Sequence, residues 1–165
     1  MRLSAVYLVG AALFITTAQA QTDEQVEACL YGGAEAGPAT VEACDVVINA
    51  GDGPHLAEAL NSRGAALITD QRLDEAIADF DQAEELGLAT SQLYGNRARA
   101  YCGQGNVQAA IDDWLAANAA SSAEQRRVTQ QFLTDRGLYE GPIDGENNEA
   151  FQAAFVTFAE GQCPS

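Results

Sequence analysis

The segments Ala57–Leu86, AEALNSRGAALITDQRLDEAIADFDQAEEL, and Ser91–Ser121, SQLYGNRARAYCGQGNVQAAIDDWLAANAAS, decide the fold because the second repeats the first. A shift of 34 residues aligns Leu60 with Tyr94, Arg63 with Arg97, Gly64 with Ala98, Leu67 with Tyr101, Ala76 with Ala110, Ile77 with Ile111, Asp79 with Asp113, Phe80 with Trp114 and Ala83 with Ala117. A repeat of this length predicts one pair of helices in each copy. Each pair buries its apolar face against its neighbour, so the sequence predicts an all-α stack of helical hairpins.

These small and aromatic positions resemble those of the tetratricopeptide repeat family. The resemblance implies a short superhelix, with clear copies at residues 57–90 and 91–121 and a repeat domain over residues 21–121. In that family the first helix of each pair lines an inner face that takes extended peptides. The peptide contacts implied for this chain are Asn61, Ala65, Ile68, Gln92 and Arg99.

Residues 1–20 have the pattern of a secretory signal peptide. Arg2 provides the charged end, Ala5–Thr17 is almost wholly apolar, and Ala18–Ala20 is a small-x-small cleavage site. The apolar core is shorter than the roughly 20 residues that a membrane span needs. We therefore expect an exported, periplasmic or otherwise envelope-located protein with no membrane span after cleavage.

The chain is strongly acidic and contains no lysine. The segment after residue 20 holds seven arginines against 24 acidic side chains, a net charge of −17. Such a field repels phosphate backbones and anionic lipid surfaces, so nucleic acid is excluded as an expected partner. An acidic, solvated surface also keeps an exported protein soluble.

Four cysteines in an exported chain predict two disulfides. Cys29 and Cys44 lie at similar distances from the Gly-rich link 32–38, so an antiparallel hairpin brings them together and leaves Cys102 to pair with Cys163. Free thiols or a metal site are the alternatives, and no metal is expected because the cysteines are far apart in sequence and His55 is the only histidine. The hairpin within residues 21–53 is interpreted as a degenerate first repeat, and Cys102–Cys163 would bring the chain end close to the inner face.

The pattern changes at Ser122, where a helical pair is predicted. One helix is expected over Ala123–Arg136 and another from about Asn148 to Glu160, where Phe151, Phe155 and Phe158 share one face. The stretch Val128–Phe158, with its Gly141-Pro142-Ile143-Asp144-Gly145 turn, resembles the small helical peptidoglycan-binding domain of cell-wall proteins. The resemblance implies that residues 122–165 contact the cell wall through Tyr139, Pro142, Asp144 and Asn147. The alternative role for this segment is a structural cap.

No arrangement of residues predicts catalysis, and no cofactor is expected. His55, the only histidine, forms no recognisable triad with a serine or cysteine nucleophile. No predicted strand is followed by a Gly-rich phosphate-binding loop. We therefore expect a non-enzymatic adaptor that contacts a protein or peptide through its repeats, with peptidoglycan as a second contact. Two alternatives remain at this stage: a pure protein-interaction module with a capping segment, and an accessory subunit of a wall-modifying enzyme.

Overall fold

The protein is all-α, as the sequence predicts. The computed structural model describes residues 23–32, 37–51 and 53–163, and within them it contains eight helices and no strand. A helix over 23–31 is followed by α2 (Pro38–Asn49), α3 (Leu56–Thr69), α4 (Leu73–Glu85), α5 (Ser91–Gly103), α6 (Val107–Ala120), α7 (Ala123–Asp135) and α8 (Glu149–Glu160). The predicted signal peptide at residues 1–20 lies outside the described residues.

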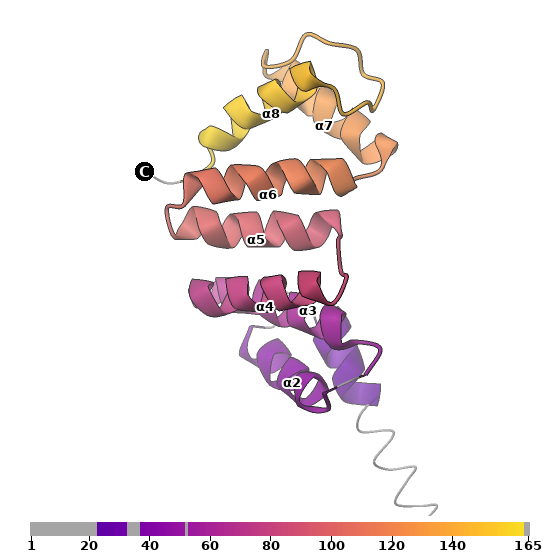
Figure 1. Ribbon diagram of the computed structural model, residues 1–165, viewed down its shortest axis with the longest axis vertical. Helices are drawn as coiled ribbons and strands as arrows, with labels where there is room; N and C mark the ends of the chain where they lie inside the picture. Colours follow the sequence, from indigo (N-terminus) through magenta and orange to yellow (C-terminus); the bar gives the residue numbers. More distant parts are fainter. Residues whose placement is uncertain (1–22, 33–36, 52, 164–165) are drawn as a thin grey trace, which may run out of the picture.

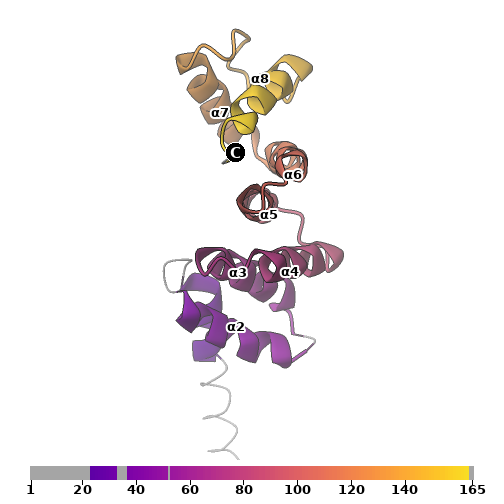
Figure 2. The same ribbon diagram turned by 90° about the vertical axis from the view of Figure 1, so that its left-hand side faces the viewer.

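The helices form an elongated stack of antiparallel pairs (Figure 1). The chain proceeds from the pair that ends in α2, through α3–α4 and α5–α6, to the crossed pair α7–α8 at the far end (Figures 1 and 2). Each pair contacts the next, since α2 packs on α3, α4 on α5 and α6 on α8. Helix α3 also contacts α5 directly, which places the first helices of two successive hairpins on one side of the stack.

Local sequence determines where several helices begin. Thr90, Asn106 and Asn148 each accept a hydrogen bond from the backbone N–H three residues later. Ser122 and Gln125 form a reciprocal capping box at the start of α7. These side chains satisfy amide groups that have no partner within the helix, so the observed starts of α5 to α8 follow from short sequence signals.

The core lies between successive hairpins and is filled by large apolar side chains around small ones. Leu60, Leu67, Phe80 and Leu93 are at most 2% exposed. Gly64 permits the close contact of α3 with α4, since a Cβ there would lie only 2.8 Å from the Phe80 ring. The aligned small and aromatic positions thus meet in space as the repeat pattern predicts.

The 34-residue period also appears in the polar contacts. Arg63 on α3 forms two hydrogen bonds with Asp79 on α4, at 2.8 and 2.7 Å. Arg97 on α5 forms the same two bonds with Asp113 on α6, at 2.7 and 2.8 Å. Such a two-bond pair fixes the orientation of both side chains, so α3–α4 and α5–α6 are each closed by one partly buried cross-link.

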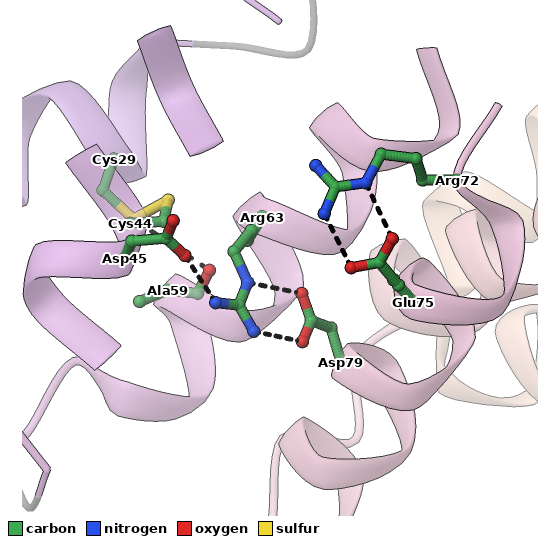
Figure 3. A network of polar contacts seen from close by, with 8 residues as sticks. All are labelled: Cys29, Cys44, Asp45, Ala59, Arg63, Arg72, Glu75 and Asp79. Atoms are coloured by element: carbon green, nitrogen blue, oxygen red, sulfur yellow. Dashed lines mark hydrogen bonds and ion pairs between the residues drawn. A yellow bond between two sulfur atoms is a disulfide. The ribbon is translucent and has the colours of Figure 1, made fainter. Parts of the chain in front are cut away.

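The same two arginines join each hairpin to the one before it. Arg63 also donates to Asp45 on α2 at 2.6 Å, and Figure 3 shows its guanidinium group between Asp45 and Asp79. Arg97 likewise reaches back to Asp81 and Glu84 on α4, at 2.7 and 2.6 Å. Neighbouring hairpins are therefore held in register by ion pairs as well as by apolar packing.

Two disulfides connect the predicted cysteine pairs. Cys29 is bonded to Cys44 with their Cα atoms 4.7 Å apart, and Cys102 is bonded to Cys163 with Cα atoms 5.0 Å apart. The first bond closes the hairpin of residues 23–31 and α2. The second attaches the chain after α8 to the end of α5. Both bonds fit an oxidising environment.

Candidate functional site

The candidate site is a pair of adjoining hollows on the side of the stack formed by α3 and α5. The inner hollow, of about 140 Å³, is bordered by the first hairpin, α3 and α5. The terminal hollow has a volume of about 490 Å³. It is bordered by the C-terminal ends of α3 and α5, by the first residue of α4, and by α6 and α8. Arg99 lines both hollows, so they meet at its side chain.

The five residues predicted to contact a peptide all border these hollows. Asn61, Ala65, Gln92 and Arg99 line the inner hollow. Ile68 and Arg99 line the terminal hollow. Because α3 and α5 contact each other, the residues from both repeats form one continuous surface. The fold therefore brings together the residues that the resemblance placed on one face.

Arg99 differs in its surroundings from the four arginines that form ion pairs. Its side chain is exposed, and its printed contact is a long hydrogen bond of 3.4 Å to the amide oxygen of Asn96 on the same helix. Arg63, Arg72, Arg97 and Arg127 are each paired with a carboxylate. Arg99 has no carboxylate partner among the described residues, so its positive charge is available to a ligand at the junction of the hollows.

Asn61 provides a second group suited to binding. The residue is 9% exposed, and its side-chain oxygen is buried without a hydrogen-bond partner in the described structure. A buried acceptor of this kind is costly when it has no donor. Asn61 borders the inner hollow, and rotation of its side chain would bring this oxygen within reach of an N–H group of a bound peptide.

Glu84, which pairs with Arg97, is held ionised by its neighbours. Glu84 accepts hydrogen bonds from Arg97 at 2.6 Å and from the Tyr94 hydroxyl at 2.9 Å. Partial burial alone would raise the pKa of Glu84, but these two bonds outweigh it and leave the pKa below its usual value. The hydrogen bond to Glu84 and partial burial raise the pKa of Tyr94. This network joins α4 to α5, and none of its members lines either hollow.

The terminal segment has a different arrangement from the one that its resemblance implied. Tyr139 is 3% exposed, its ring packs edge-on against Phe151, and its hydroxyl donates to the Pro142 carbonyl at 3.1 Å. A ring buried in this way offers no face for stacking on a sugar. The expected stacking role of Tyr139 is therefore replaced by a core role, because the aromatic side chains of α8 need a partner.

The turn containing Asp144 is tied to α7. Gln130 is fully buried, and its side chain accepts from the Gly145 N–H at 2.8 Å and donates to Asp144 at 3.2 Å and to the Glu146 carbonyl at 3.0 Å. The backbone N–H of Glu146 and then the Gln130 amide lower the pKa of Asp144. Gly145 has φ +79°, and a Cβ there would lie 2.3 Å from the Ala123 carbonyl oxygen, so only glycine fits.

Pro142 and Asn147 complete the predicted set of cell-wall contacts. Pro142 is exposed beside Ile143, whereas Asn147 is partly buried and its side-chain oxygen has no hydrogen-bond partner. The Asn147 carbonyl accepts from the Gln152 side chain at 3.1 Å. Taken together, these contacts fold the segment, and two of the four predicted residues, Pro142 and Asp144, remain at the surface.

The aromatic wall of the terminal hollow was not predicted. Trp114 on α6 and Phe155 and Phe158 on α8 are partly buried and line this hollow beside Ile68 and Leu73. The sequence places the two phenylalanines on one face of α8, but it does not say which helix that face meets. The predicted bond between Cys102 and Cys163 was the available signal, since it locates the end of α8 near α5.

No protein-family model, no curated protein and no solved structure matches the chain. In the described part of the chain, no helix combines the length and the apolar character needed to cross a membrane.

Proposed function

We propose that this protein is a non-enzymatic, exported adaptor that binds an extended segment of a protein partner along the inner face of α3 and α5. The observation that carries the proposal is the junction of two hollows at Arg99, with all five expected contact residues on their borders. Arg99 and the unpartnered Asn61 oxygen provide one charged donor and one acceptor for a peptide main chain or side chain.

The helical pairs are interpreted here as tetratricopeptide-type repeats, and the first hairpin as a degenerate copy. The repeated Arg–Asp pairs and the 34-residue spacing support this interpretation. The two disulfides and the predicted signal peptide support export to a bacterial periplasm or a similar envelope compartment.

A partner with a basic surface suits the overall charge. The chain has a net charge of −16, so a basic segment would be attracted over a distance, while Arg99 would take one acidic group within it. We therefore expect the rate of association to fall as salt is added, because screening weakens attraction between separated charges.

The test is a selection of random peptides on the oxidised chain from Gln21 to Ser165, followed by titration of the selected sequences. Arg99→Gln and Asn61→Ala should each weaken binding about tenfold, the effect expected for one lost hydrogen bond to a charged or buried group. Arg127→Gln, which removes the same charge from a surface pair with Glu124, is the matched control. Selected peptides that bind both inner-face variants at full affinity would contradict the proposal.

For the segment of residues 122–165 we propose a role as a cap that also forms one wall of the terminal hollow. The buried Gln130, the Tyr139 ring and the bond from Cys163 to α5 support a structural role. In a sedimentation assay with purified insoluble peptidoglycan, the protein should stay in the supernatant. The Tyr139→Ala/Asp144→Ala variant should melt at a lower temperature. The opposite result would be that the wild-type chain sediments with peptidoglycan and that this variant does not, although its melting temperature is unchanged. The segment would then be a cell-wall contact and not only a cap.

A further inference from the structure

We propose that the terminal hollow is a binding site for a small ligand that carries a carboxylate on an apolar chain or aromatic ring. The ligand would place its apolar part against Trp114, Phe155 and Phe158 and its carboxylate against Arg99. This site is distinct from the inner hollow, because α8, which lies outside the repeats, forms one of its walls. The proposal does not depend on peptide binding by α3 and α5.

The size and lining of the hollow suit a small molecule. Its volume of about 490 Å³ lies within the range of roughly 300–1,000 Å³ that is typical of small-ligand sites. Ile68 and Leu73 close the side opposite α8, and the three aromatic rings are only partly buried by their protein neighbours. Partly buried aromatic rings around a hollow leave apolar surface that a ligand can remove from water.

The charge distribution selects an anionic head group. The chain has 24 acidic side chains, yet none of them lines this hollow. Arg99 is the cation on its border, and it has no carboxylate partner among the described residues. The side chains of Gln71 and Gln162 add neutral polar groups at the same border. A carboxylate is the ligand group for which a guanidinium has matching geometry and charge.

The disulfide between Cys102 and Cys163 makes the hollow a built feature of the oxidised protein. Cys102 itself lines the hollow, and its partner lies three residues after the last residue of α8. The bond attaches the chain just after α8 to α5, in addition to the contacts that α8 makes with α6 and α7. Binding should therefore require this bond.

The experiment uses Trp114, the only tryptophan of the chain, as the reporter. The oxidised chain from Gln21 to Ser165 is titrated with decanoate, with decanol as the tail alone and with acetate as the head alone. Decanoate should change the Trp114 emission in a saturable way, and acetate should not. Arg99→Gln should weaken decanoate binding about tenfold and leave decanol binding unchanged, as expected for loss of one charge-assisted contact.

Three further variants distinguish binding in the terminal hollow from effects of net charge or of disulfide loss elsewhere in the chain. Arg127→Gln makes the same change of charge at a surface pair and should bind decanoate as the wild type does. Cys102→Ser/Cys163→Ser should lose binding, whereas Cys29→Ser/Cys44→Ser should retain it. The proposal is overturned if neither decanoate nor the peptide acid of the second arm binds, or if the acid that binds has the same affinity for Arg99→Gln as for the wild type.

A second arm identifies the source of the carboxylate. Acetyl-Ala-Ala-Phe carries a carboxylate and an aromatic ring, as the end of a peptide chain can. The matched control is the same peptide with a C-terminal amide in place of the carboxylate, which removes the charge. Saturable binding of the acid with no binding of the amide would assign the hollow to a chain end, and binding of decanoate alone would assign it to a free acid. Failure of both acids would overturn the inference, while peptides selected for the inner face could still bind.

Discussion

The hairpin of residues 23–49 is closed by the Cys29–Cys44 bond, whereas α3–α4 and α5–α6 are each closed by an arginine–aspartate pair. Cys29 precedes Arg63 by the same 34 residues that separate Arg63 from Arg97. Cys44 stands next to Asp45, which pairs with Arg63 of the following hairpin. The covalent cross-link of the first hairpin thus matches the charged one at Cys29 and is displaced from it by one residue at Cys44, since Asp45 is the residue 34 positions before Asp79.

This difference follows from the number of neighbours that each hairpin has. The pair α3–α4 is packed on both sides by other hairpins, so its arginine is shielded from water and satisfied by carboxylates of two hairpins. The first hairpin packs on one side only among the described residues. An arginine at this end would have carboxylates from only one neighbouring hairpin to pair with, whereas Cys29 and Cys44, which are 1% and 0% exposed, need no polar partner.

The largest expected change in unfolding free energy follows removal of a charged cross-link. Arg97→Leu leaves Asp113, which is 7% exposed, without its cation and should cost about 3–5 kcal/mol of unfolding free energy. Arg97→Leu/Asp113→Leu should recover much of this loss, because no charge then remains buried. Urea unfolding measures both. Arg127→Leu, at an exposed pair, is the control and should change stability by under about 1 kcal/mol. Equal losses in the single and double variants would show that the charge itself is not what matters.

Removal of the covalent cross-link should cost slightly less and act locally. Cys29→Ser/Cys44→Ser opens a loop of 15 residues, for which loop entropy predicts a loss of about 3 kcal/mol. Hydrogen exchange should show lost protection in α2 and unchanged protection in α6. If α6 loses protection to the same extent, the hairpins unfold as a single cooperative unit, and the comparison between them fails.

Acid should weaken the ion pair between Arg97 and Glu84, which joins two hairpins, and spare the disulfide. The pKa of Glu84 is lowered from its usual value of 4.5, so its contribution to stability is complete above about pH 4.5 and is lost as the pH falls through the lower folded-state value. Melting temperatures measured from pH 7 to pH 3 should fall below this point. Glu84→Gln should make the fall shallower, and Cys29→Ser/Cys44→Ser should leave its slope unchanged. A steeper fall in Glu84→Gln would contradict the sign of this shift.

The smallest expected effect on stability lies in the turns that join α3 to α4 and α5 to α6. Gln71 has φ +60° between α3 and α4, at the position that Gly105, with φ +75°, occupies between α5 and α6. Gly105→Gln should cost about 1 kcal/mol, because a side chain is unfavourable in this backbone region. Gln71→Gly should change stability by less than this, since relief of strain is offset by greater freedom of the unfolded chain. Thermal melts of both variants test whether the two turns are equivalent.

Much of the fold could be predicted from sequence because its elements are local. The ladder from Leu60/Tyr94 to Ala83/Ala117 located the hairpins, and Ser122 and Asn148 marked the starts of α7 and α8. The cysteine pairing was also predictable, since an antiparallel hairpin leaves one arrangement for Cys29 and Cys44. The site was predicted in part: Asn61, Ala65, Ile68, Gln92 and Arg99 border the hollows, but the aromatic half of the terminal hollow was absent from the prediction.

By itself, the sequence determined which residues form helices, which helices pair and which cysteines bond, because period, caps and spacing act over short distances along the chain. Only the tertiary structure decided that α8 crosses to α6 and borders Arg99, that Tyr139 turns into the core, and that Arg63 and Arg97 each join two hairpins. These outcomes depend on which faces meet after folding. An apolar helix face is buried against whichever other face fits it, and the pattern of residues along one helix does not specify which helix that will be.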